Sequence, residues 1–290
     1  ALAYSGIGNS YSKQESPEPL DSLFKFSSRD NHYDAHQGEY RDLLKELETK
    51  KSMYGDQHPE VADCYENLAI ECNKQGDYKR TLECFFKCLE IRKLVHGENH
   101  PDVAGSYFNI GTAKSQHQEY SEALDYLSKA LEINKFIYGE KHRAVAGCYQ
   151  NLGNLYIFQR EYPKALEYFL EALEIKKFVY GENHPQTARA FSNVGTTYSH
   201  LGEVTKGLEN FLKALEINKS VYGENQPEVA TLYNSIGTIY EYQREPSKAI
   251  AYLSKALEIE KSIKGENDPE IAIYYDRLGV KYVNQDEYEK

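Results

Sequence analysis

The chain has 290 residues and a formal net charge of −11 at neutral pH, from 45 acidic and 34 basic residues. Binding to nucleic acid or to an anionic membrane surface needs clustered positive charge, and the sequence contains no Lys/Arg-rich block, which argues against both kinds of partner. No apolar run approaches the ~20 residues of a membrane-spanning helix, and no apolar signal segment stands at the N-terminus.

The number and spacing of the cysteines indicate the cellular compartment. There are five, an odd number, and four of them fall within residues 64–88, which is not a disulfide framework. We therefore expect a reducing, intracellular location, the cytoplasm. The chain begins at Ala1 without a methionine, so we expect it to be a fragment of a longer protein.

The first segment, residues 1–34, differs from the rest. Its opening stretch ALAYSGIGNSYSKQ predicts one helix, and the two prolines and several Ser, Asp and Asn residues that follow predict a loop or an irregular cap. A helical pattern resumes in EYRDLLKELETKKSMYG, and we assign residues 35–290 to a single regular array.

That array is defined by a strict period of 42 residues, marked by Gly55, Gly97, Gly139, Gly181, Gly223 and Gly265. Similar segments surround these glycines, including YGDQHP, HGENHP, YGEKHR and YGENHP. A sequence that repeats every 20–50 residues is typical of solenoids, propellers and arrays.

Each period predicts two helices. In the unit that opens at Pro101, a proline at the first helical position begins the helix PDVAGSYFNIGTAKSQ, with His100 as its expected N-cap. A polar turn, HQE, leads to a second helix, YSEALDYLSKALEINKFIY, which we expect Gly139 to end in the left-handed conformation. Apolar residues recur at spacings of three and four in both helices, so each has one buried face.

Neither helix of such a pair can bury its apolar face alone, so the pairs must stack. We expect five full units, starting near residues 59, 101, 143, 185 and 227, and a truncated sixth from residue 269. The predicted fold class is all-α, an α-solenoid of helix–turn–helix hairpins that forms a right-handed superhelix.

Small residues indicate where the two helices of a pair meet. One position of the first helix is always small: Ala69, Gly111, Gly153, Gly195, Gly237 and Gly279. Departures from the pattern are expected to loosen single units. Gly207, for example, replaces an alanine of the second helix, and glycine within a helix costs roughly 1 kcal/mol relative to alanine.

No catalytic motif or cofactor-binding loop is present, so we predict no catalytic residue, no cofactor and no enzymatic activity. The recurring histidines His58, His100, His142 and His184 stand in different units, and we interpret them as residues at helix starts. Cys64, Cys72, Cys84 and Cys88 share one unit, but Cys72 and Cys88 take core positions. Buried structural thiols are therefore favoured over a zinc site, and we predict no metal site.

The segments HPEVADCYENLA, HPDVAGSYFNIG and HPQTARAFSNVG resemble the tetratricopeptide repeat (TPR), which usually has 34 residues. The 42-residue form is similar to the repeats of kinesin light chains and nephrocystin-3-type proteins. This resemblance implies that the first helix of each unit lines a concave groove. It also implies that an asparagine two residues before the small residue can hold the backbone of a bound peptide.

Four asparagines stand at that position, and the resemblance makes them candidate peptide-binding residues: Asn67, Asn109, Asn151 and Asn193. An amide can pair with a peptide group whatever the peptide's side chain. The alternative is that these amides only brace neighbouring units. The neighbours expected on the same face, which would set specificity, are Phe108, Thr112, Gln150, Asn154, Phe158, Arg189, Ser192, Thr196, His200, Asn234, Thr238 and Tyr242.

Two functions remain open. The first is a non-catalytic scaffold or adaptor that binds a peptide or helical segment of another protein in the groove. Because Arg189 stands nearly alone as a basic residue in the centre, a strongly acidic ligand is disfavoured. The second is a structural solenoid that associates weakly end to end. The residues expected to lack a partner helix are Ile271, Tyr275, Leu278 and Tyr282.

Overall fold

The computed structural model describes the backbone of residues 34–288 and the side chains of residues 38–280. The described residues form α-helices and no strand. The helix and loop that the sequence predicts before residue 34 lie outside them. The helices are α2 (Asp34–Tyr54), α3 (Pro59–Lys74), α4 (Tyr78–His96), α5 (Pro101–Gln116), α6 (Tyr120–Tyr138), α7 (Arg143–Phe158), α8 (Tyr162–Tyr180), α9 (Pro185–His200), α10 (Val204–Tyr222), α11 (Pro227–Tyr242), α12 (Pro246–Lys264) and α13 (Pro269–Tyr288).

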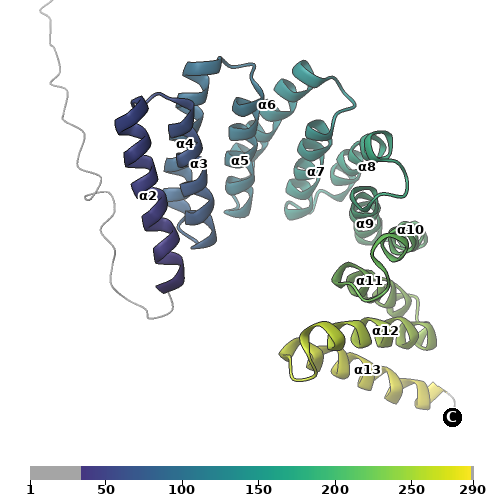
Figure 1. Cartoon of the computed structure of the whole chain (residues 1–290). Helices are drawn as coiled ribbons and strands as arrows, with labels where there is room; N and C mark the ends of the chain where they lie inside the picture. Colours follow the sequence, from purple (N-terminus) through teal and green to yellow (C-terminus); the bar gives the residue numbers. More distant parts are fainter. Residues whose placement is uncertain (1–33, 289–290) are drawn as a thin grey trace, which may run out of the picture.

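Helices α3 to α12 form five hairpins, and each hairpin packs on the next through the second helix of one and the first helix of the other. The stacked hairpins form a curved array, with α2 at one end and α13 at the other (Figure 1). The predicted all-α solenoid of helical hairpins is therefore confirmed.

Local signals at the joints between hairpins explain where the helices begin and end. The side chains of His58, His100, His142 and His184 cap the four helices that follow them, each through Nδ1, which accepts a hydrogen bond from a backbone N–H two residues later. The glycines at the ends of α4, α6 and α8 have φ of 79°, 78° and 87°, as their assignment as helix stops predicts. Their ψ, however, is 172°, 174° and 166°, so these residues adopt a second positive-φ conformation that essentially only glycine can reach, and not the left-handed helical one.

Within a hairpin the helices meet at the predicted small residues. A Cβ added at Gly153 would lie 2.7 Å from the ring of Phe169, and one added at Gly111 would lie 2.8 Å from Cγ of Leu127. Gly207 lies against the preceding helix, where an added Cβ would be 2.6 Å from Oγ of Ser199. The structure thus gives Gly207 a packing role that its sequence pattern did not indicate.

A second feature recurs between hairpins: at one repeated position of the second helix, a polar side chain is buried in every unit from α4 to α12. The residue differs from unit to unit, and the set is Arg92, Asn134, Lys176, Asn218 and Glu260. Arg92 donates hydrogen bonds to Asp63 in the first helix of its own unit and to Ser106 in the first helix of the next. Polar contacts at this position can therefore join one unit to its neighbour.

Lys176 in α8 is the member of this row with the least favourable electrostatics. It is 5% exposed, and its amine donates to Oε1 of Gln150 at 2.5 Å. Burial, together with the nearby charge of Arg189, lowers the pKa of Lys176 to about 8. The folded protein therefore holds this side chain in its charged form at a cost in stability near neutral pH.

We predict that Gly153→Ala destabilises the protein by about 1–3 kcal/mol, because the new methyl group would overlap the ring of Phe169. Gly147 is a matched control in the same helix, since nothing lies within 4 Å of a Cβ added there. Gly147→Ala should stabilise by about 0.5–1 kcal/mol. Urea unfolding followed by circular dichroism measures both changes, and equal effects of the two alanines would contradict this packing.

We also predict the pH dependence of the Lys176→Met variant. Its free energy of unfolding, minus that of the wild type, should fall by about 3 kcal/mol between pH 7 and pH 10.5. Between pH 8 and the usual lysine value of 10.5, the unfolded chain still binds the proton that folded Lys176 has released. Wild-type stability therefore rises with pH in this window relative to the variant. Denaturant unfolding across the window tests this, with Lys79→Met, which removes a lysine side chain that is 88% exposed, as the control for loss of a surface charge.

Candidate functional site

The first helices of the hairpins lie on the inner side of the curve. In Figure 1, α7 and α9 face the hollow of the array, whereas α8 and α10 lie on its outer side. Contacts agree with this placement: α5 touches α7 directly, as expected for helices on the inside of a bend. We call the solvent-facing surface of α3, α5, α7, α9 and α11 the inner face.

All the sequence-predicted site residues belong to these helices. Nine of them are half-buried: Phe108, Asn109, Thr112, Gln150, Asn151, Asn154, Ser192, Asn193 and Asn234. The other seven are exposed: Asn67, Phe158, Arg189, Thr196, His200, Thr238 and Tyr242. The helices thus hold these side chains at a surface from which they could contact a ligand.

The four asparagines do not have equivalent surroundings. Nδ2 of Asn109 donates to Oε1 of Glu66 in the preceding unit at 2.6 Å. Oε2 of the same carboxylate accepts from Arg92 at 2.6 Å, and Arg92 also reaches Asp63. Burial opposes the charge of Arg92, but the hydrogen bonds to Glu66 and Asp63 outweigh it and raise the pKa of the guanidinium. At Asn109 the amide therefore braces two units.

Asn151 and Asn193 are less engaged. Nδ2 of Asn151 makes one long contact, 3.4 Å, to the carbonyl of Gly147 in its own helix. The side chain of Asn193 has no hydrogen-bond partner within the described part of the chain. These two amides retain donors and acceptors for another molecule.

A second positive charge lies beneath the centre of the inner face, on the buried Lys176 of α8. Arg189 in α9 is exposed, and Lys176 lies close enough to it for their charges to interact. Sequence reasoning missed Lys176 because it belongs to a second helix, and only its contact with Gln150 shows that it reaches the first helices.

The last residues of α7, α9 and α11 form one edge of the inner face, and aromatic stacking links this edge to the preceding unit. Phe158 stacks on Tyr120 with ring centroids 6.4 Å apart, and His200 stacks on Tyr162 at 4.7 Å. Tyr242 is 74% exposed. Aromatic surface is therefore available to an apolar ligand group at this edge.

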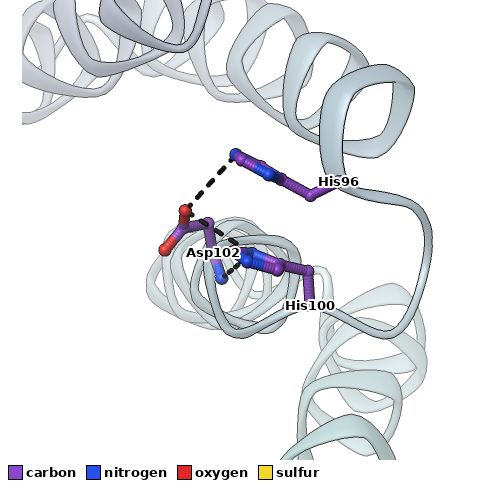
Figure 2. A group of neighbouring side chains, drawn as sticks. All are labelled: His96, His100 and Asp102. Carbon is purple, nitrogen blue, oxygen red and sulfur yellow. Dashed lines mark hydrogen bonds and ion pairs between the residues drawn. The ribbon is translucent and has the colours of Figure 1, made fainter.

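Cysteine and histidine side chains supply the two groups that could bind a metal. The cysteines predicted to be buried are free and buried, and Cys148 is as well. Burial raises the pKa of Cys88 and of Cys148 to about 11, which disfavours the thiolate that metal binding requires. His96, His100 and Asp102 instead gather at the surface of the joint between α4 and α5 (Figure 2).

No helix within residues 34–288 combines the length and the apolar character needed to cross a bilayer.

Comparison with solved structures finds similar folds at low sequence identity. BtubC (BKLC) from P. vanneervenii matches with a TM-score of 0.71 and 20% identity, over 82% of this chain and 95% of that one. A putative kinesin light chain from Podosopora anserina, with nearly identical TPR-like repeats, matches with a TM-score of 0.63 and 16% identity, over 71% of this chain and 98% of that one. The APC/C hetero-tetramer Cut9–Hcn1 matches with a TM-score of 0.56 and 16% identity, over 84% of this chain and 40% of that one.

Comparison with curated proteins gives no match. The family model described as tetratricopeptide repeat matches residues 72–135, 118–177, 145–204 and 186–262, and these stretches together cover more than half of the chain. No enzymatic family is indicated. With its hairpins stacked as in the kinesin light chain-like structures, the chain belongs to the tetratricopeptide repeat family.

Proposed function

We propose that this protein is a non-catalytic scaffold or adaptor that binds an extended peptide or a helical segment of another protein on its inner face. Tetratricopeptide repeat scaffolds typically mediate protein–protein interactions. The observation that carries the proposal is the pair Asn151 and Asn193, which lie one unit apart on α7 and α9 and keep most of their hydrogen-bonding capacity. Equivalent amides at a regular spacing suit the repeating backbone of an extended peptide.

The side chains around these two asparagines indicate which chemical groups the ligand should carry. Thr196, Ser192 and Asn154 add neutral polar groups, and Phe158 adds an aromatic surface. Arg189, with the charge of Lys176 behind it, favours one carboxylate at the junction of α7 and α9. The proposed ligand is therefore a mainly neutral segment with a single acidic group near its middle.

A second candidate function is end-to-end association of the solenoid, and α13 carries the observation that favours it. The sequence pattern predicts that Ile271 and Leu278 lack a partner helix. That prediction is wrong, because both side chains are buried against α12. Ile273, Tyr275 and Val280 are exposed on α13 instead. An apolar helix surface at the end of an array can stack on another copy.

We predict that Asn151→Ala with Asn193→Ala weakens binding of a peptide selected from an array of acidic, neutral and basic sequences by about 10- to 100-fold. Each amide would lose hydrogen bonds worth about 0.5–1.5 kcal/mol to a neutral partner. The stability of the double variant should change by less than about 0.5 kcal/mol, because neither amide braces a neighbouring unit. Fluorescence anisotropy with the labelled peptide and urea unfolding measure the two quantities.

Asn109→Ala is the matched control, because its amide is committed to Glu66. It should lower the free energy of unfolding by about 1 kcal/mol.

A double variant that binds as tightly as the wild type but unfolds more easily would favour bracing over peptide binding. Sedimentation at increasing protein concentration separates the second candidate, since self-association should survive the double substitution.

A further inference from the structure

The joint between α4 and α5 departs from the pattern of the other joints. At three other joints a tyrosine at the end of one unit stacks on the capping histidine of the next, for example with centroids 4.5 Å apart for Tyr54 and His58 and 4.1 Å for Tyr138 and His142. Here His96 replaces the tyrosine and stacks on His100 at 4.1 Å. Two imidazoles therefore lie where the other joints have one imidazole and one phenol.

A carboxylate completes the group. Oδ2 of Asp102 lies 3.7 Å from Nε2 of His96 and 3.5 Å from Nδ1 of His100 (Figure 2). One ligand atom from each residue lies within 4.8 Å of the others. The corresponding residue is also acidic in other units, as at Glu60 in α3, but in the described part of the chain only at Asp102 does the carboxylate lie beside two histidines. Within the described residues, no other three His, Cys, Asp or Glu side chains converge in this way.

These distances are close to those of a metal site. Zn²⁺ holds imidazole nitrogens and carboxylate oxygens at about 2.0–2.2 Å, so two ligands at a tetrahedral angle are about 3.3–3.5 Å apart. The separations of 3.5 and 3.7 Å from the carboxylate are close to this value, and the two stacked imidazoles have to turn so that a lone pair of each points at the ion. His96 and Asp102 are exposed, so an ion can enter from solvent and a water molecule can fill the fourth position.

The surroundings also permit a cation. The guanidinium of Arg92 approaches the backbone carbonyl of Asp102 at 3.5 Å, but its charge is balanced by Asp63 and Glu66. Nδ1 of His100 accepts the backbone N–H of Asp102 at 3.2 Å, a weak cap that coordination to the metal would replace. The carboxylate of Asp102 offsets the positive end of α5.

We propose that His96, His100 and Asp102 bind a divalent transition-metal ion, with Zn²⁺ the best match, at the α4–α5 joint. Two imidazoles and a carboxylate suit zinc, whereas Mg²⁺ prefers oxygen ligands. The sequence-based expectation of no metal site rested on the recurring histidines, which stand in different units, and on the cysteines, and it left His96 out of account. Because the ligands come from the end of α4 and the start of α5, the ion clamps two neighbouring units together and stabilises their junction.

Titration of the full 290-residue chain with Zn²⁺ by isothermal calorimetry tests the proposal. His96→Tyr is the matched variant, since it recreates the tyrosine–histidine stack of the neighbouring joints and should preserve the fold. We expect one site in the wild type, bound at least about tenfold more weakly by His96→Tyr and by Asp102→Asn. His142→Asn, which changes a capping histidine of another joint, should bind Zn²⁺ like the wild type.

Thermal unfolding gives an independent measurement. Zn²⁺ should raise the midpoint of the wild type and leave that of His96→Tyr nearly unchanged, because a ligand that binds only the folded state stabilises it. Mg²⁺ at the same concentration should raise neither. Equal Zn²⁺ affinity of the wild type and His96→Tyr would overturn the proposal, as would the absence of binding to the wild type.

Discussion

The close contact between the two helices of each hairpin is the constraint on which the rest of the structure depends. Cγ of Leu127 and of Leu253 and the ring of Phe169 lie within 2.9 Å of where a Cβ would stand on Gly111, Gly237 and Gly153. Only a residue without a side chain allows this approach in these units. Because a small residue allows a close approach of this kind along the array, the hairpins resemble one another, and stacking them produces the curve in Figure 1.

The backbone is nearly the same in each unit, and the units differ mainly in the side chains at a few polar positions. The buried row from Arg92 to Glu260 occupies one place in each second helix, yet its charge varies: it is positive at Arg92 and Lys176, neutral in the units that follow these two, and negative at Glu260. Arg92 is surrounded by carboxylates, whereas Lys176 meets an amide and the charge of Arg189. The electrostatic character of the inner face therefore changes along its length, although the backbone beneath it does not.

The joints perform a different task, since they end one helix, start the next and set the spacing of the units. A histidine cap and an aromatic stack occupy the same few residues, as at Tyr180 and His184. Further contacts repeat there: Lys219 pairs with Glu224 and lies over the ring of Tyr233, and Lys261 does the same with Glu266 and Tyr275. These contacts repeat from joint to joint. Where His96 stands in place of the tyrosine, the chemistry of the joint differs but the stacking of the two rings is kept.

The sequence by itself determined the period, the two helices of each unit and the residues that cap them. For the unit from Pro101 the predicted helices agree with α5 and α6, because helix starts, stops and apolar spacing are local properties. Only the tertiary structure decided which amide is occupied, which lysine lies behind the inner face and which residues of α13 are covered. Asn109 meets Glu66, Lys176 meets Gln150, and Leu278 packs against α12, each through contacts between different helices. Such contacts join residues far apart in the chain, so neither spacing nor propensity within one unit could specify them.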